Sequence, residues 1–178
     1  MNNYIIMDSQ IFFEENYADF EIFKKEKEKI LLEEMKRENS KGSSIRMVLD
    51  SYLFQDIITL HYTIYIYSGG AHDIRVDRIY YYDLKQQREV ELEDLIDINA
   101  DFTDKIRNFA SDYLKKEKKE LIYDDEYMFQ DGLKEFRYFI FDENSLILLF
   151  PPYQVGPWSS GEILVPIPYS DIASFLKI

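Results

Sequence analysis

The sequence predicts an α+β fold in which an antiparallel sheet is packed by two main helices and a short C-terminal helix. Residues 17–39, and the residues from 101 onward, repeat apolar side chains at the 3.6-residue period of a helix. Between residues 45 and 82 the apolar side chains instead alternate with the period of two that strands show. Short turns join these strands, so we expect a meander, to which strands at 145–150 and 162–167 are added.

The composition indicates one compact domain over residues 1–178. A chain of this length buries roughly 70 % of the surface that its unfolded form exposes, and its 15 Tyr and 13 Phe supply bulky core material. The 34 acidic residues outnumber the 21 basic ones, and the net charge of -13 disfavours nucleic acids and anionic membranes as partners. The same charge keeps a domain soluble and attracts cationic partners. The absence of Cys excludes disulfides, thiolate catalysis and Cys-ligated zinc.

The first helix, residues 17–39, is predicted to be amphipathic. Its polar side, which includes the charged run 24–29, is expected to face solvent. The turn formers of residues 39–44, with Gly42 among them, are expected to end it. Its apolar stripe consists of Tyr17, Phe20, Phe23, Ile30, Leu31 and Met35.

Three strands are expected next, at 45–54, 57–67 and 73–82, with Gln55-Asp56 as a tight hairpin connection. In the second strand one face carries Ile58, Leu60, Tyr62, Ile64 and Ile66. The opposite face is expected to be partly exposed or covered by the helix, and it carries Thr59, His61, Thr63, Tyr65 and Tyr67.

The second half begins with a turn and ends with a helix. The long helix is expected to be capped by Asn99 or Asp101, and the strand 145–150 is a candidate exposed edge. In order, we expect a turn at 83–87, an extended piece at 90–92, a helical turn at 93–96, the helix from 101, strands at 136–141, 145–150 and 162–167, and a short helix capped by Ser170.

The strand end Ser68-Gly69-Gly70-Ala71-His72 is the first candidate ligand-binding segment. Two successive glycines allow backbone geometry and close approach that other residues forbid. Such a pair serves either as a bulge that bends the sheet or as a direct ligand contact. Ser68, Gly69, Gly70 and His72 are therefore candidate binding residues.

The loop 150–161 is the second candidate segment. Three prolines stiffen it, and it displays Tyr153 and the single Trp of the chain, Trp158. Flat amphipathic rings suit sugar stacking or a hot spot for a protein partner. The same loop also fits a structural role as a plug over a sheet edge.

Few residues support catalysis or metal binding. His61 lies mid-strand with no nucleophile motif beside it, and is expected to be a packed side chain. The acidic segment 124–131 lacks the order of an EF-hand and is expected to be a solvated connection, with a cation site as the alternative. No nucleotide-binding glycine motif occurs. We therefore predict no catalytic residue, no metal and no cofactor, although the many carboxylates leave a glycan hydrolase open.

Three passages carry a resemblance to a known bacterial pattern: Tyr67 to His72, Tyr82-Asp83-Leu84 leading into Glu91 to Leu95, and the loop 150–161 followed by 165–169. Together they resemble the paired DUF4163 and DUF3298 domains, also found in the extracytoplasmic region of the lysozyme-responsive anti-sigma factor RsiV and beside peptidoglycan deacetylase domains. The resemblance assigns residues 1–82 to a DUF4163-like half and 83–178 to a DUF3298-like half. Two departures from the pattern are Asp73 in place of a glycine and Trp158 in place of a tyrosine.

The resemblance implies a non-catalytic, extracytoplasmic module of the bacterial cell envelope. Its expected partner is a cationic, lysozyme-like protein or a cell-wall glycan, with no nucleic acid and no direct membrane insertion. The residues themselves show no signal peptide or transmembrane segment. Two alternatives remain: a peptidoglycan or glycan hydrolase that uses paired carboxylates, and a structural accessory domain of a longer envelope protein.

Overall fold

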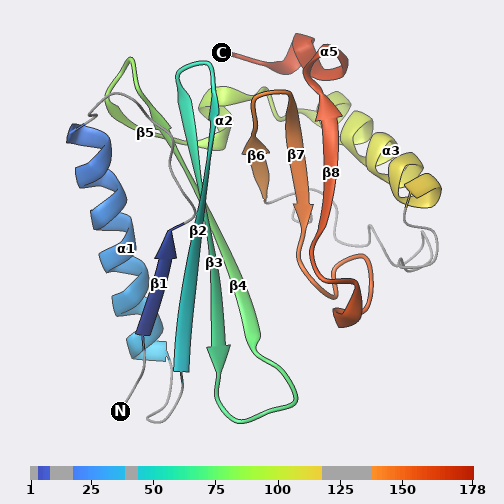
Figure 1. Cartoon of the computed structure of the whole chain (residues 1–178). Coiled ribbons are helices and arrows are strands. Elements are labelled where there is room, and N and C mark those ends of the chain that lie inside the picture. The colour runs from blue at the N-terminus through green and yellow to red at the C-terminus, as the bar shows by residue number, and fades with distance from the viewer. Residues whose placement is uncertain (1–3, 9–17, 39–43, 118–137) are drawn as a thin grey trace. The chain divides into compact units, whose positions relative to one another are not determined.

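A computed structural model of the chain describes residues 4–8, 18–38, 44–117 and 138–178. The chain divides into two compact units, Met1–Val90 and Glu91–Ile178, which are described separately below (Figure 1). The predicted halves meet at residues 82 and 83, eight positions earlier than this division. That residues 1–178 act as a single domain stays a prediction.

The first unit is a five-stranded sheet with one long helix, which confirms the predicted α+β class. Strands β2 to β5 form an antiparallel meander, whereas β1 pairs in parallel with β2 at the edge and was not predicted as a strand. The elements, in the spatial order of the sheet, are β1 (Tyr4–Asp8), β2 (Ser44–Phe54), β3 (Ile57–Tyr67), β4 (Ile74–Asp83) and β5 (Arg88–Val90), with α1 (Ala18–Glu38) preceding β2.

The core of the first unit lies between α1 and one face of the sheet. The hydroxyl of Tyr62 donates a hydrogen bond to the carbonyl of Lys24 in α1 at 3.4 Å, and the rings of Phe23 and Tyr82 lie 5.0 Å apart. The alternation predicted for β3 is confirmed, because its apolar face is buried in this core. The buried set includes Phe20, Phe23, Leu31 and Met35 of α1 and Ile58, Leu60, Tyr62, Ile64 and Ile66 of β3.

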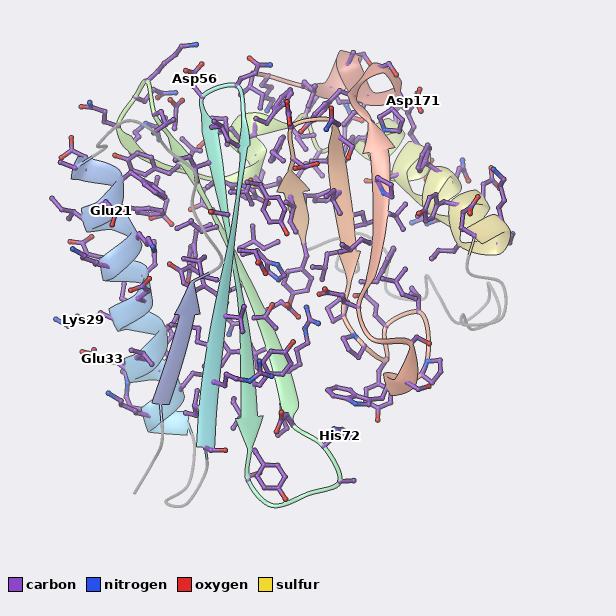
Figure 2. All side chains as sticks on the ribbon, viewed as in Figure 1. Glu21, Lys29, Glu33, Asp56, His72 and Asp171 are labelled. Atoms are coloured by element: carbon purple, nitrogen blue, oxygen red, sulfur yellow. The ribbon has the colours of Figure 1, made fainter. Side chains whose placement is uncertain are left out.

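Two predictions for α1 are wrong. Ile30, which was assigned to the apolar stripe, is 44 % exposed. At that turn of the helix its neighbour Leu31 is the side chain that is buried in the core. Lys24, assigned to the solvated face, is 7 % exposed and its carbonyl receives the Tyr62 hydroxyl. Lys29 and Glu33, by contrast, project from the side of α1 that faces away from the sheet (Figure 2).

Two of the predicted turns of the first unit, at Gln55-Asp56 and at residues 83–87, are present. Gln55 adopts a φ of 53° in the connection between β2 and β3, and Leu84 donates its N–H to the carbonyl of Asp56 at 2.8 Å. In the turn after β4, Oδ1 of Asp83 accepts the N–H groups of Lys85 and Gln86 at 2.8 and 2.9 Å. A carboxylate in this position accepts hydrogen bonds from backbone N–H groups of the turn, which have no partner strand.

The second unit is a three-stranded antiparallel sheet with α3 on one face. The rings of Phe102 in α3 and Phe139 in β6 lie 5.9 Å apart, and the same face of the sheet is buried through Leu148 and Val165. Its elements are α2 (Leu92–Leu95), α3 (Ala100–Glu117), β6 (Phe139–Phe141), β7 (Ser145–Phe150), η2 (Trp158–Ser160), β8 (Ile163–Pro168), α5 (Tyr169–Ile172) and η3 (Ala173–Phe175).

One cap prediction for the second unit is confirmed, and one is wrong. Oδ1 of Asn99 accepts the N–H of Phe102 at 2.9 Å, as a residue before a helix is expected to do. Ser170 is not the cap of the last helix, because α5 begins at Tyr169 and Pro168 precedes it. Proline fixes φ near the value that a helix start accepts.

The prediction of an exposed edge at residues 145–150 is also wrong. β7 lies between β6 and β8 and pairs with both. β8 is an edge strand of this sheet, and Pro166 and Pro168 remove two of the amide groups that a further strand would need.

Several predictions fall outside the described residues. These are the role of Tyr17, the turn with Gly42, and the acidic segment 124–131 with its alternative cation site. Within the ranges that the structure describes, no helix is both long enough and apolar enough to cross a membrane.

Replacing Leu31 and Ile30 of α1 tests the packing of the first unit. Leu31→Ala removes a fully buried side chain and is expected to lower the free energy of unfolding by about 2–5 kcal/mol. Ile30→Ala, one position earlier, is expected to cost less than about 1 kcal/mol because that side chain is largely exposed. Urea denaturation followed by circular dichroism measures both. Equal losses would contradict the orientation of α1.

Candidate functional site

The face of the first sheet opposite α1 carries polar residues in aligned rows. Cross-strand pairing places Arg46, Tyr65 and Arg75 side by side on β2, β3 and β4. The next row contains Thr63 and Asp77. Because directly opposed residues share a face, both rows lie on one face of the sheet, with the apolar Val48 opposite Thr63 on β2. The predicted partial exposure holds only at one end of β3, since Thr59, His61 and Thr63 are buried, while Tyr65 is half-buried and Tyr67 exposed.

A hydrogen-bonded network surrounds Asp77 on this face. Nε2 of His61 lies 2.8 Å from Oδ1 of Asp77 and donates to it when the carboxylate is ionised. Nη2 of Arg75 donates to Oδ1 at 2.7 Å and its Nε donates to Oδ2 at 3.0 Å. The Asp77 side chain is 1 % exposed. The prediction that His61 is a packed side chain fits this arrangement.

The pKa of Asp77 is lowered by this network. Burial alone would raise the pKa of the carboxyl group, but hydrogen bonds from His61 and Arg75, together with the positive charge of Arg75, outweigh burial. Asp77 therefore stays ionised and holds Arg75 in a fixed position within the sheet. A buried charge that is paired and hydrogen-bonded in this way avoids the large cost of an isolated one.

The exposed end of the polar face carries a cation stacked on an aromatic ring. The guanidinium carbon of Arg46 lies 4.0 Å from the centroid of Tyr65, and that of Arg75 lies 6.0 Å from the same ring. Arg46 is exposed, and so is Tyr67, the next residue along that face of β3. We name Arg46, Tyr65 and Tyr67 the Arg46 surface.

The predicted segment Ser68 to His72 follows Tyr67 directly and is the loop between β3 and β4. All five residues are exposed, and Figure 2 shows His72 in the loop beyond the ends of both strands. Gly69 adopts a φ of 90°, a conformation that favours glycine. Nδ1 of His72 donates to the carbonyl of Asp73 at 2.9 Å. The loop therefore turns the chain at an exposed end of the sheet, next to the Arg46 surface.

The second predicted segment lies in the second unit, between β7 and β8. The rings of Tyr153 and Trp158 lie 5.7 Å apart with an angle of 38° between their planes. Tyr153 is 55 % exposed and has a φ of 75°, whereas Trp158 is half-buried. Val155, between them, is buried and anchors the loop. We name Tyr153 and Trp158 the aromatic pair.

Backbone hydrogen bonds between residues three positions apart stiffen this loop further. Gln154 donates its N–H to the carbonyl of Pro151 at 3.2 Å, and Ser160 donates to that of Pro157 at 2.9 Å. Gly161 has a φ of 66° where the chain turns into β8. The alternative role of the loop as a plug over a sheet edge stays a prediction.

The six predicted binding residues therefore form two groups. Ser68, Gly69, Gly70 and His72 belong to the first unit, and Tyr153 and Trp158 to the second. Sequence reasoning missed Arg46 and Tyr65, although the strand alternation already placed Tyr65 and Tyr67 on one face.

Metal chemistry has no cluster to support it in the described part of the chain. No group of three or more His, Asp or Glu side chains there is arranged to hold a metal ion. His61 and Asp77, which lie 2.8 Å apart, are both buried.

Comparison with known proteins finds a family model that matches most of the second unit. Residues 93–170 match the family described as "Protein of unknown function (DUF3298)". This confirms the DUF3298 part of the resemblance. The DUF4163-like half and the likeness to RsiV stay predictions. The matched residues extend from α2 to the beginning of α5 and contain the aromatic pair.

One curated relative extends over nearly the whole chain. The chain is 27 % identical over 177 residues to the peptidoglycan-N-acetylmuramic acid deacetylase PdaC of Bacillus subtilis (strain 168), which covers 96 % of this chain and 36 % of that protein. The chain thus spans about a third of the length of this relative.

Two solved structures share the fold. A DUF3298 family protein from Pseudomonas aeruginosa PAO1 has a TM-score of 0.60 at 17 % identity, covering 83 % of this chain and 68 % of that one. A DUF3298 family member from Bacteroides fragilis NCTC 9343 has a TM-score of 0.56 at 19 % identity, covering 83 % and 61 %. At these identities the likeness shows the fold alone.

Replacing Asp77 tests the network of the first unit through its pH dependence. Because the pKa of Asp77 is lower in the folded state, its stabilisation is present above the unfolded value of about 3.9 and is lost as the pH falls through the folded value. Asp77→Asn is expected to cost about 2 kcal/mol at pH 7. The difference from wild type is expected to shrink below about pH 4.

Urea denaturation at pH 7, 5, 4 and 3 measures this difference. Asp112→Asn is the matched control, because it removes the same charge from an exposed position of α3. A difference between wild type and Asp77→Asn that stays constant down to pH 3 would contradict the assigned role of the Asp77 carboxylate.

Proposed function

We propose that this chain is a non-catalytic binding module of the bacterial cell envelope, located outside the cytoplasm, that recognises the glycan of the cell wall. The observation that carries the proposal is the aromatic pair, which lies within the residues that match DUF3298. A second candidate partner is a cationic protein.

The aromatic pair has the properties of a sugar-binding platform. Tyr153 exposes more than half of its side chain, and Trp158 lies against it at 5.7 Å. Large aromatic rings supply contact area at a low cost in side-chain entropy, and the apolar C–H face of a sugar ring packs against them. Pro151, Pro152 and Pro157 restrict the loop before any ligand arrives, which reduces the ordering cost of binding.

The relationship to PdaC supports a wall polymer as the ligand. That protein is named as a deacetylase of peptidoglycan N-acetylmuramic acid, and this chain corresponds to about a third of its length. A module that binds the glycan would hold an enzyme of this kind near its substrate, which raises the effective concentration of the reacting groups. The relationship also supports the proposed location outside the cytoplasm.

A non-catalytic role is supported by the geometry of the ionisable groups. His61 and Arg75 both donate hydrogen bonds to the carboxylate of Asp77 on the face of the sheet. The two alternatives, a glycan hydrolase and a structural accessory domain, make different predictions: the first consumes glycan and the second binds none.

The cationic-protein candidate is favoured by charge. A net charge of -13 attracts a basic partner and speeds its encounter, and this attraction falls steeply as salt is added. Stacking of sugar on aromatic rings depends little on salt. The ionic-strength dependence therefore separates the two partners.

Replacing Tyr153 tests the glycan platform. Tyr153→Ala is expected to weaken binding to purified cell-wall glycan about tenfold, because the loss of one stacked ring costs about 1–3 kcal/mol when the ring is a main contact. Tyr153→Phe keeps the ring and is expected to bind like wild type. Cosedimentation with insoluble glycan at 50 and 300 mM salt measures the affinity.

Four outcomes decide between the candidates. Salt-independent binding that is lost in Tyr153→Ala supports the glycan platform. Binding to a basic protein such as lysozyme that disappears at 300 mM salt, with no binding to glycan, favours the second candidate. Release of soluble sugar from the glycan would contradict a non-catalytic role. Equal affinity of wild type and Tyr153→Ala would contradict the platform.

A further inference from the structure

The Arg46 surface presents an exposed positive charge with no acidic partner among the described residues. Arg46 is exposed, and none of the ion pairs or hydrogen bonds found there involves its guanidinium group. Its guanidinium carbon lies 4.0 Å from the centroid of the Tyr65 ring. In a chain with 34 acidic and 21 basic residues, a charge kept apart from carboxylates is available for a ligand.

The neighbouring Arg75 shows why only one of the two cations is available. Arg75 stands in the same row, but both oxygens of Asp77 accept its hydrogen bonds, at 2.7 and 3.0 Å. Its position is fixed by that pair, and it borders Tyr65 on the side away from Arg46. Tyr65 is thus held between a fixed cation and an exposed one.

The geometry of Arg46 suits a carboxylate. The guanidinium carbon of Arg46 lies over the Tyr65 ring, and the N–H bonds of a guanidinium group all lie in its own plane. Two parallel N–H groups match the two oxygens of a carboxylate in a bidentate pair. The stacked ring also restricts the long Arg side chain, which lowers the entropy lost on binding.

The surroundings of Arg46 suit a sugar. Tyr67 is 45 % exposed on the same face of β3, one alternation along from Tyr65. Its cross-strand neighbour is Ser44, a small exposed residue that leaves the ring uncovered on that side. Tyr67 thus offers a ring face next to the cation.

We propose that the Arg46 surface binds a carboxylate carried on a sugar ring, with Arg46 holding the carboxylate and Tyr67 packing against the ring. This inference rests on the proposed function for the choice of glycan, because a muramic acid unit carries a free lactyl carboxylate wherever no stem peptide is attached to it. The net charge of -13 repels a ligand with many closely spaced negative charges. A glycan with one carboxylate per disaccharide presents a single negative charge to Arg46.

Two tetrasaccharides of equal length test the inference. One alternates N-acetylglucosamine with N-acetylmuramic acid and carries two carboxylates, and the other consists of N-acetylglucosamine alone and carries none. Wild type is expected to bind the carboxylated one about fivefold more tightly at 150 mM salt. A partly exposed charge pair contributes up to about 1 kcal/mol, which corresponds to that ratio. Isothermal titration calorimetry on the whole chain measures both affinities.

Variants at Arg46 assign the preference to this surface. Arg46→Gln is expected to bind both tetrasaccharides equally, and Arg46→Lys, which keeps the charge but loses the planar fork, to retain less than half of the preference. Arg88→Gln is the matched control, because it removes an exposed Arg from β5 in the same unit and is expected to leave the preference intact. Circular dichroism verifies the fold of each variant.

The outcomes separate this inference from the proposed function. Equal binding of both tetrasaccharides by wild type overturns the carboxylate site and leaves glycan recognition standing. A preference that persists in Arg46→Gln places the carboxylate elsewhere and also overturns it. Competition by inorganic phosphate that matches acetate at equal ionic strength would indicate a general anion site and overturn the assignment to a carboxylate. Binding of neither tetrasaccharide, and of no intact glycan, contradicts both proposals.

Discussion

The strict alternation of β3 is the constraint on which the first unit depends. β3 is the middle strand of the five-stranded sheet, and it is paired along its whole length with β2 and along most of it with β4. Every second side chain therefore faces α1, and the others face the opposite side. A shift of the pairing by one residue would move Tyr62 out of the core and Thr63 into it. Such a shift would also separate Arg46 from Tyr65, so the same register that buries the core builds the Arg46 surface.

The two faces of β3 are stabilised by different interactions. Burial of apolar side chains against α1 stabilises one face, at roughly 25 cal/mol for each Å² removed from water. On the other face the charge of Asp77 is balanced by Arg75 and His61, which fix one another by hydrogen bonds. Arg75 of this pair lies in the same row as Tyr65 and the exposed Arg46, so a fixed side chain supports the ring that contacts the exposed cation. The aromatic pair of the second unit is held by prolines and by the buried Val155 instead.

The sequence predicted the helices, the strands and their turns because those depend on local periodicity. The β3 alternation and the cap at Asn99 followed from residue types at fixed spacing. Ile30 and Lys24 of α1 were assigned to the wrong sides, because a stripe of apolar residues gives the width of a helix face only roughly and tertiary contacts decide its borders. β1 was missed because its partner β2 lies more than 35 residues away in the chain, and the position of β7 inside its sheet depends on the same kind of distant pairing. The Arg46 surface needed the cross-strand register, which alternation within one strand does not supply.

Mapping of a soluble wall glycan onto the chain by NMR tests the central claim most directly. Backbone amide signals of the whole chain would be followed during titration with the tetrasaccharide of alternating N-acetylglucosamine and N-acetylmuramic acid. The account predicts saturable shifts centred on Tyr153 to Trp158 in the second unit and on Tyr65 to His72 in the first, with the sugar recovered unchanged. Shifts at neither segment, or cleavage or deacetylation of the sugar by this chain alone, would contradict it.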